Sequence, residues 1–220
     1  MLKLVNRLLK KLSFYNFKDQ HFTLLPISFF EGNDVTEIAK YLISCVIVSD
    51  IAGKRTAGII TETEAYSGFN DKASHAFQQR RTTRNEAMFL SGGHIYVYLC
   101  YGLHYMLNIV TNQEHFADAV LIRSIEPIEG IEVMLERRKK EKPQRNLSCG
   151  PGNVAQALGI TLSLNKNRLQ EKSIGIYQLD NSLTNLLLVG KRIGVEYAEE
   201  DSLKLWRFGL KNSAWLSKPF

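Results

Sequence analysis

The sequence predicts a single mixed α+β domain in which a curved, mainly antiparallel β-sheet is flanked by helices. Short apolar or alternating runs occur in pairs around turn residues, as expected for β-hairpins. Between them lie a few segments with helical periodicity. A chain of 220 residues with 45% hydrophobic residues is also long enough to bury a sizeable core. Because no internal repeat, low-complexity tract or clear linker interrupts it, we expect one domain over residues 19–220, preceded by an extension over residues 1–18.

Charge, cysteines and hydropathy narrow the class of protein. A net charge of +6 and a pI near 9.2 favour polyanionic partners without proving them. Cys45, Cys100 and Cys149 form no CxxC pair, which argues against a disulfide framework and a structural zinc site. No apolar run approaches the roughly 20 residues of a membrane span, and the N-terminus lacks the apolar core of a secretory signal. We therefore expect a soluble intracellular protein that makes no membrane contact.

The extension over residues 1–18 is basic and contains no acidic residue. Its leucines and valine recur at helical spacing, which is typical of a basic amphipathic helix that contacts nucleic acid or membrane, or of an organelle-targeting segment. A frayed terminal extension is an equally good interpretation.

A helix and a hairpin are predicted next. Asp34 and Glu37 resemble a capping box at the start of a helix that ends near Leu42. A strand over residues 45–49 and a turn over residues 50–54 follow, and a second strand completes the hairpin.

The second strand of this hairpin contains residues 59–66, which read IITETEAY. In a strand, alternation places Ile60, Glu62, Glu64 and Tyr66 on one face. Acidic residues are depleted in strands, so the pattern conflicts with simple core building, and such conflicts concentrate at functional sites. A strand whose carboxylates merely face solvent is the alternative that the pattern leaves open.

Residues 67–84 form a long polar loop that contains His75. Loops of this length in compact domains are usually functional or disordered. Thr83 and Glu86 are predicted to cap a short helix that ends near Leu90. The loop also carries basic side chains that are candidates for phosphate contacts, at Arg80, Arg81 and Arg84.

Two tyrosine-rich strands are predicted over residues 96–99 and 105–110, with Gly102 near the turn between them. Asn108 is unusual in an apolar strand, because an amide without partners there costs about 1–3 kcal/mol. A structural, hydrogen-bonded asparagine is one interpretation and a functional asparagine is the other. The tyrosines can likewise be core residues or a surface on which a ligand stacks.

Residues 119–125 form another apolar strand in which Arg123 is embedded. A buried guanidinium needs a carboxylate partner, because an unpaired buried charge is severely destabilising. Glu62 or Glu64 is the natural candidate. A purely structural ion pair remains an alternative for this arginine.

The remainder of the chain is predicted to add two helices and the last strands. Pro127 is expected to open a helix that ends near Lys140, with a basic, solvated C-terminus. The turn over residues 148–152 precedes an apolar helix over residues 154–158, and a glycine-rich turn at a helix N-terminus, which includes Gly152, offers amides to a phosphate. Strands that close the sheet are expected at residues 191–197 and 205–215.

The candidate residues favour one kind of chemistry over several others. The five histidines lack HExxH spacing, the zinc-deaminase pattern is absent, and no GxSxG elbow exists for a serine nucleophile. Carboxylates, tyrosines and basic clusters suit cleavage of an N-glycosidic bond in nucleic acid. Glu62 and Glu64 would lie roughly 6.5–7 Å apart, which also fits the acid/base pair of an inverting glycoside hydrolase. Carboxylates alone therefore do not choose the substrate.

An ordered series of motifs carries a family resemblance over about residues 22–218. It comprises ETEAY with His75 nine residues after its tyrosine, then RRTTRN, MF, YVYLCYG, an asparagine in the following strand, LIRSIEPIEG, CGPG before QALGI, and WRFGLKNSAWLS. In this combination and order the chain resembles the alkyladenine (3-methyladenine) DNA glycosylase family. An ordered set is far more specific than any single motif.

The resemblance implies catalytic roles for residues that match the family motifs. Glu64 would be the general base that activates water, and Arg123 would help to orient that water and the carboxylate. Glu62 would be a supporting residue. Strand periodicity puts both acids on one face and cannot separate them, so the choice of Glu64 depends on the resemblance.

The resemblance also implies roles in holding the base and the DNA. Tyr66 and Tyr98 would sandwich the flipped base, and His75 would complete the wall and hydrogen-bond to the base edge. Tyr101 would wedge into the gap left by the flipped nucleotide. Asn108 would exclude normal guanine by crowding its 2-amino group.

The expected partner is double-stranded DNA that contains a damaged purine. The resemblance implies a monofunctional DNA glycosylase of base excision repair that acts on alkylated purines of the 3-methyladenine type, with hypoxanthine as a further substrate that would need protonation to leave. We expect no cofactor or metal, a monomer, and a DNA-associated location in the cytoplasm, nucleoid or nucleus. A non-catalytic nucleic-acid-binding module of the same fold, or a nucleosidase acting on free nucleosides, are the alternatives.

Overall fold

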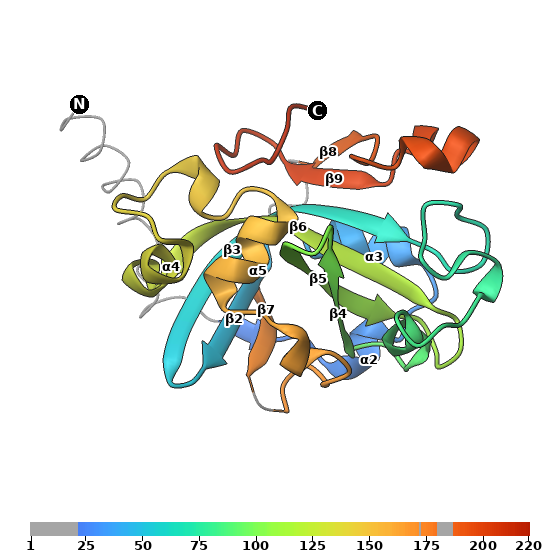
Figure 1. Cartoon of the computed structure of the whole chain (residues 1–220), viewed down its shortest axis with the longest axis horizontal. Coiled ribbons are helices and arrows are strands. Elements are labelled where there is room, and N and C mark those ends of the chain that lie inside the picture. The colour runs from blue at the N-terminus through green and yellow to red at the C-terminus, as the bar shows by residue number, and fades with distance from the viewer. Residues whose placement is uncertain (1–21, 172, 180–186) are drawn as a thin grey trace.

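The computed structural model describes residues 22–171, 173–179 and 187–220 of the chain. In these ranges nine strands form one open sheet in which every paired neighbour is antiparallel, and helices lie on both faces (Figure 1). The α+β fold class predicted from the sequence is confirmed. The predicted extension over residues 1–18 lies outside the described residues.

The elements have the following bounds. The strands are β1 (Phe22–Leu24), β2 (Val46–Ile51), β3 (Lys54–Tyr66), β4 (Ile95–Cys100), β5 (His104–Thr111), β6 (Asp118–Glu129), β7 (Ile174–Leu179), β8 (Leu187–Gly190) and β9 (Arg207–Leu210). The α-helices are α2 (Ile27–Phe30), α3 (Val35–Tyr41), α4 (Ile131–Arg138) and α5 (Pro151–Leu158). Short 3₁₀ helices include η2 (Glu86–Phe89), η4 (Leu162–Leu164) and η5 (Glu196–Leu203).

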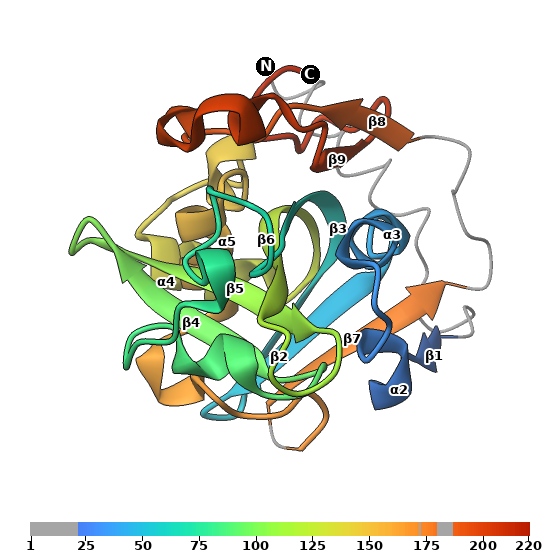
Figure 2. The ribbon, with the colours of Figure 1, turned by 90° about the vertical axis from the view of Figure 1, so that its right-hand side faces the viewer.

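Strand β3 is the centre of the sheet, whose order is β1-β7-β2-β3-β6-β5-β4. One edge of β3 pairs with β6. The other edge pairs first with β2 and then, near Glu62 and Glu64, with β9. The predicted β2–β3 hairpin is confirmed, and its turn is made by Ala52 and Gly53, which both have positive φ. Figure 2 shows β8 and β9 as a layer along one side of the molecule.

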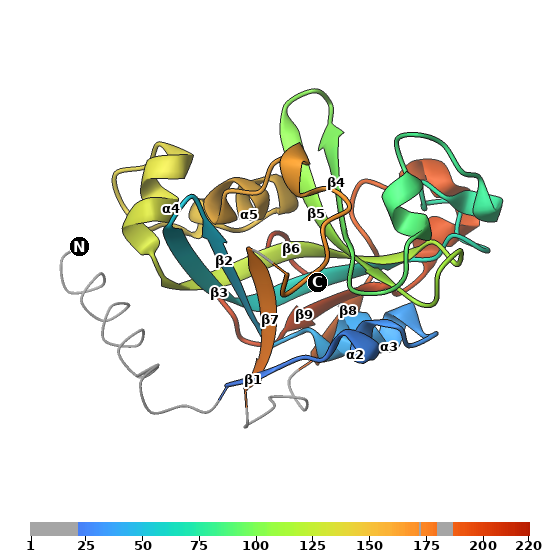
Figure 3. The ribbon, with the colours of Figure 1, turned by 90° about the horizontal axis from the view of Figure 1, so that it is seen from below.

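The two faces of β3 contact different helices. The carboxylate of Asp34 accepts hydrogen bonds from the backbone amides of Thr36 and Glu37, so the predicted start of α3 is confirmed. Thr63 of β3 donates its hydroxyl to the carbonyl of Ala39, which fixes α3 against this face. Helices α4 and α5 lie on the opposite face (Figure 3). Glu64 therefore points to the side of the sheet that carries α5.

The β4–β5 hairpin projects from the body of the domain (Figures 2 and 3). It pairs from Ile95 opposite Ile109 to Cys100 opposite His104, in agreement with the predicted strands. Its turn contains Tyr101 and Gly102, both with positive φ, as in a type I′ turn.

The start of α4 differs from the sequence prediction. Pro127 does not open a helix but lies in β6 opposite Gly58, where the register of the β3–β6 pair shifts. Proline is tolerated at such an irregularity because it has no N–H to donate. The strand ends at Glu129. Gly130, which follows it, has a φ of +68°, and a Cβ there would lie 2.2 Å from the carbonyl oxygen of Arg55. The helix can therefore begin only at Ile131.

Two further predictions of local structure are wrong, and a third is correct only in part. Thr83 does not cap a helix, because Asn85 Oδ1 instead accepts from the amide and hydroxyl of Thr82, and η2 begins without a side-chain cap. Residues 191–197 form no strand, since the polar groups of Arg192 and Ile193 bind to β3 and to the loop that follows it. Of the predicted strand over residues 205–215, only Arg207–Leu210 is a strand.

Candidate active site

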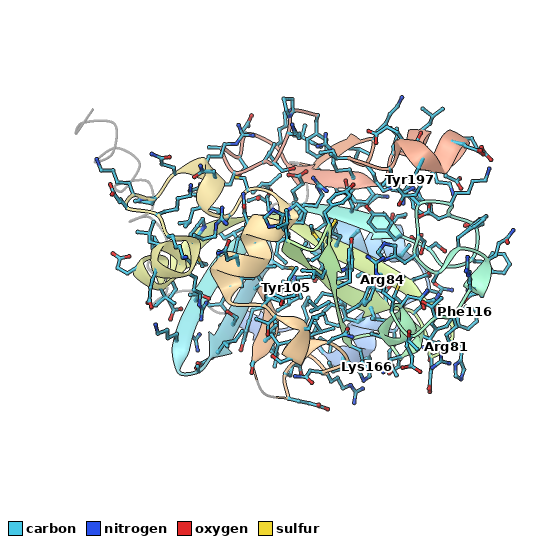
Figure 4. The ribbon with its side chains drawn as sticks, viewed as in Figure 1. Arg81, Arg84, Tyr105, Phe116, Lys166 and Tyr197 are labelled. Carbon is cyan, nitrogen blue, oxygen red and sulfur yellow. The ribbon has the colours of Figure 1, made fainter. Side chains whose placement is uncertain are left out.

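A cavity of about 430 Å³ opens beside β3, β4, β5 and β6. Most of the residues that the sequence indicated line it: Tyr66, His75, Arg84, Tyr98, Tyr101, Asn108 and Arg123. Arg84 and Tyr197, which both line the cavity, lie on the face shown in Figure 4, with Arg81 and Lys166 on the same face. The fold thus gathers residues from β3, the polar loop and the tyrosine-rich hairpin into one site.

Glu64 is completely buried directly behind the cavity wall. Its Oε2 accepts from the hydroxyl of Tyr66 at 2.7 Å and from Nη1 of Arg123 at 3.2 Å. Its Oε1 accepts from the backbone amide of Ile193 at 2.8 Å. All three donors belong to residues that line the cavity. An ionised carboxylate has about four acceptor positions, so these three bonds leave Glu64 with capacity for a further donor such as water.

Glu62 is equally buried but has a different environment. Within the described part of the chain its carboxylate accepts five hydrogen bonds, from Arg123 Nε, Arg207 Nη1, Ser124 Oγ, and both the amide and the hydroxyl of Ser217. These donors fill its acceptor positions. Glu62 is therefore a structural centre that joins β3, β6, β9 and the C-terminal segment, whereas Glu64 is the acid next to the cavity.

Burial and hydrogen bonding act against each other on the Glu64 carboxyl group. Desolvation raises its pKa above the ordinary value, and this effect exceeds the opposing influence of Arg123, the Tyr66 hydroxyl and the Ile193 amide. Burial and the neighbouring Glu64 raise the pKa of Tyr66 well above its ordinary value, so its hydroxyl stays protonated and donates. The site therefore contains a carboxylate whose affinity for a proton is increased.

An aromatic wall faces this acid. The imidazole of His75 lies edge-on to Tyr98, with ring centroids 4.6 Å apart, and its Nδ1 is 2.9 Å from the hydroxyl of Tyr96. The amide of Asn85 donates to the carbonyl of His75 and holds the loop in place. Partial burial of the ring and the nearby Arg84 lower the pKa of His75, which keeps the imidazole neutral at pH 7.

Asn108 and Tyr101 both belong to the β4–β5 hairpin, Asn108 within β5 and Tyr101 in the turn. Asn108 is buried on β5, and its Nδ2 donates to the carbonyl of Tyr96 at 3.1 Å, which satisfies the amide while the side chain still lines the cavity. Tyr101 is 93% exposed in the turn of the projecting hairpin, with Leu103 exposed beside it. An aromatic ring left this exposed gains little from folding and is available to a partner.

The candidate phosphate-binding residues divide into two groups. The guanidinium of Arg84 lies over the ring of Tyr98, 5.6 Å from its centroid, at the cavity. Arg80 is exposed and Arg81 lies over Phe89, and neither lines the cavity. Gly152 also lies outside the lining, and a Cβ there would come within 2.9 Å of the His104 side chain.

Sequence reasoning missed the segment over residues 192–197. Ile193, Gly194, Val195 and Tyr197 line the cavity, and the Ile193 amide reaches Glu64. The sequence does contain an indication of this segment: Arg192 is a charged residue that follows an apolar stretch, much as Arg123 lies within one. Among the residues that the structure describes, no group of three or more histidine, cysteine or acidic side chains is placed to bind a metal ion, and no helix is long and apolar enough to cross a membrane.

Comparison with known proteins identifies the class of this chain. Residues 28–214 match the model of the family described as methylpurine-DNA glycosylase (MPG). A relative from Chlamydia felis is 45% identical over 186 residues, which cover 84% of this chain and 95% of the relative. One from Clostridium acetobutylicum is 43% identical over 195 residues, covering 86% and 95%, and one from Bacillus cereus is 40% identical over 202 residues, covering 88% and 98%. All three are named as 3-methyladenine DNA glycosylases.

The protein is therefore a DNA glycosylase, a hydrolase of DNA repair, as the sequence motifs predicted. Within that class, the chain belongs to the methylpurine-DNA glycosylase family.

Proposed function

We propose that this chain is a monofunctional glycosylase that flips alkylated purines of the 3-methyladenine type out of duplex DNA and hydrolyses their N-glycosidic bond. A water activated by Glu64 would attack C1′ of the deoxyribose, leaving an abasic site and the free base. The main support for this proposal is the position of Glu64, which is buried against three cavity-lining donors. Its carboxylate can still accept one further hydrogen bond.

The environment of Glu64 suits a general base. As the glycosidic bond breaks, positive charge develops on the sugar, which a carboxylate stabilises while it takes a proton from the attacking water. The raised pKa makes Glu64 a stronger base than a solvated carboxylate. Arg123 holds the same carboxylate oxygen that Tyr66 holds, so the geometry of the base is fixed from two sides.

The aromatic cavity suits a cationic purine. 3-Methyladenine in DNA is positively charged, and a cation is attracted to a tyrosine face by about 0.5–2 kcal/mol. A neutral His75 avoids repelling this charge and leaves a ring nitrogen for the base edge. Tyr66 and Tyr98 would stack on the base, and Asn108 would exclude guanine by contact with its 2-amino group. A neutral lesion such as hypoxanthine would leave less readily, because it needs protonation.

The projecting hairpin suits binding to a duplex. Tyr101, at its tip, would enter the stack in place of the flipped nucleotide, as apolar side chains do in proteins that kink DNA. Arg84 beside the cavity and a net charge of +6 would favour contact with phosphates. We propose that the protein acts as a monomer on DNA inside the cell, since one chain contains every residue that these steps require.

The test is base release from duplex DNA that contains 3-methyladenine, measured beside release from the free nucleoside. We expect wild type to release the base from the duplex, and the Glu64→Gln variant to bind the duplex without releasing it. Release from the nucleoside alone would indicate a nucleosidase. Binding without release by wild type would leave only a nucleic-acid-binding module, which the family relationship does not favour.

A further inference from the structure

Arg192 forms the most completely buried ion pair beside the cavity. Its side chain and that of Asp71 are both 0% exposed, and Nη1 and Nη2 bind the two carboxylate oxygens of Asp71 at 2.5 and 2.7 Å. Asp71 belongs to the loop that leads from β3 to His75. The pair therefore joins two separate segments of the cavity wall, the loop over residues 67–76 and the rim segment over residues 192–197.

The same guanidinium also binds the backbone on either side of this pair. Nη1 donates to the carbonyl of Ala65 at 2.9 Å, and Nη2 donates to the carbonyl of Asp201 at 3.1 Å. Ala65 lies on β3 between Glu64 and Tyr66. Tyr66 lines the cavity, and Glu64 lies behind the cavity wall. Arg192 is thus attached to β3 between these two residues of the site.

Arg192 contacts the ring of Tyr66 directly. Its guanidinium carbon lies 4.8 Å from the centroid of Tyr66 and 5.2 Å from that of Trp206. The hydroxyl of Tyr66 is held at the same time by Glu64. The tyrosine is therefore restrained at its face by Arg192 and at its hydroxyl by the carboxylate.

The next residue in the chain connects Arg192 to Glu64. The backbone amide of Ile193 donates to Oε1 of Glu64 at 2.8 Å, and a second tie between the two wall segments comes from Tyr197, whose hydroxyl donates to the carbonyl of Ala73 at 3.1 Å. Ile193 is adjacent to Arg192. The contacts that hold the Arg192 side chain therefore determine how closely the Ile193 amide approaches the Glu64 carboxylate.

The arrangement is poorly explained by stability alone. A fully buried ion pair loses its hydration, and apolar residues of similar volume are often at least as stabilising. In the described part of the chain Nε of Arg192 is buried without a hydrogen-bond partner, which is a further unfavourable term. The pair does hold a loop, an aromatic ring and a backbone amide in one fixed geometry.

We propose that Arg192, held by Asp71, is a positioning residue that keeps the Tyr66 ring and the Ile193 amide in register with Glu64 during base removal. This inference rests on the proposed function of Glu64. Loss of the guanidinium would release the rim segment, remove the amide from Oε1 and allow the Tyr66 ring to tilt. The carboxylate would then lose a donor that favours its ionised form.

The pH dependence of Glu64 provides a readout that reports on this geometry. The charged or titratable groups that act on Glu64 are Glu62 and Tyr66 on its own strand β3, Arg123 on β6, Tyr98 on β4, and Arg192 and Arg207 from the C-terminal part of the chain. All of them remain in the Arg192 variants except Arg192 itself. A change in the acid limb of the rate profile therefore follows from the lost guanidinium and the displaced Ile193 amide.

The experiment measures single-turnover release of 3-methyladenine from duplex DNA between pH 5 and pH 9 with Arg192→Met, Arg192→Lys and Asp71→Asn. We expect Arg192→Met to lower the rate constant about 10- to 100-fold and to shift its acid limb to higher pH, with unchanged affinity for the DNA. Arg192→Lys should show an intermediate loss, because an ammonium cannot hold Asp71 and both carbonyls in the same geometry.

Arg137→Met is the matched control. Arg137 is a partly buried arginine of α4 that likewise donates to two backbone carbonyls, those of Ala157 and Lys54, but it lies outside the cavity lining. The Arg137→Met variant should have a lower melting temperature but an unaltered acid limb in its pH–rate profile. If Arg192→Met does not fold, Arg192→Lys and Asp71→Asn carry the same comparison.

The outcomes distinguish the positioning role of Arg192 from the proposed function of Glu64. Release by wild type together with an unchanged rate and acid limb in the Arg192 variants would overturn the positioning role alone. A loss of affinity with an unchanged rate constant would also overturn it. Absence of release by wild type would overturn the proposed function, and this inference with it.

Discussion

The hydroxyl of Tyr66 donates to Oε2 of Glu64 at 2.7 Å, so the aromatic face of the cavity and its buried acid are one hydrogen-bonded unit. Among the residues that the structure describes, Glu62, two positions away on the same strand, has no such link to an aromatic side chain. Its carboxylate is held by arginine and serine residues instead. This difference separates two acids that alternation alone makes equivalent.

Glu64→Gln and Glu62→Gln should fail in different ways. Glu64→Gln should abolish base release with a smaller loss of stability than Glu62→Gln, because it removes the proposed base, whose ionised form is already disfavoured by burial. Glu62→Gln should lower the free energy of unfolding by about 3–5 kcal/mol, because an amide nitrogen would face donors and leave buried charges unpaired. Chemical denaturation and single-turnover release, measured on both variants, check this. Equal turnover by Glu64→Gln and wild type would remove Glu64 from the mechanism.

The rate of base release should rise with pH through the raised pKa of Glu64. A general base acts only when it is ionised, so the acid limb should lie above the ordinary value of 4.5 for a glutamate side chain. The linked effect on stability has the opposite direction. Since the folded state holds this proton more tightly than the unfolded state, the contribution of Glu64 to stability is lost as pH rises through its folded pKa. Denaturation curves of wild type and Glu64→Gln should therefore diverge in favour of the variant at higher pH.

Affinity for a cationic base should decrease as pH falls through the pKa of His75. This pKa lies below its ordinary value of 6.5, so the ring is neutral at pH 7 and becomes an imidazolium only in more acidic solution. The charged ring would repel the base, and the stability contributed by the neutral ring would be lost over the same fall in pH. Binding of lesion-containing duplex to the Glu64→Gln protein, with and without His75→Gln, measures the effect. The same pH dependence in both proteins would contradict it.

Tyr101→Ala should weaken base flipping without affecting the fold. The ring is 93% exposed, so its removal should change stability by less than about 0.5 kcal/mol. Loss of one aromatic–base stack should cost about 1–3 kcal/mol in the flipped complex. Fluorescence of a 2-aminopurine placed beside the lesion reports flipping. Leu162→Ala, which removes an exposed side chain of η4 outside the cavity lining, is the control. Unaltered affinity and rate for Tyr101→Ala would refute the wedge.

Asn108→Gly should admit undamaged guanine. The Asn108 side chain lines the cavity and is fixed by its bond to the Tyr96 carbonyl, so a glycine would remove a rigid obstacle where the 2-amino group is expected. Release of guanine and of 3-methyladenine from the same duplex, measured in one reaction, provides an internal reference. An unchanged ratio of the two products would count against steric exclusion.

Local patterns predicted much of the scaffold. Asp34 and Glu37 marked the start of α3, and the paired runs around Gly53 and Gly102 marked the two hairpins. The predictions failed where a distant contact overrode the local signal. Pro127 remained in a strand because β6 continues along β3 to Glu129. Residues 191–197 are apolar enough to be predicted as a strand. Arg192 and Ile193 instead hydrogen-bond to β3 and to the loop that follows it.

By itself the sequence determined which residue types share a face. The period of two in β3 put Glu62, Glu64 and Tyr66 together, and an arginine embedded in an apolar strand required a carboxylate partner, which Arg123 finds in both acids. The choice between those acids came from a family resemblance. The tertiary structure distinguished their environments, because the donors that fill Glu62 include Ser217, 155 residues away in the chain. The pair of Arg192 with Asp71, 121 residues apart, has the same origin. Periodicity is a property of neighbouring residues, whereas hydrogen-bond partners are set by where the chain returns in space.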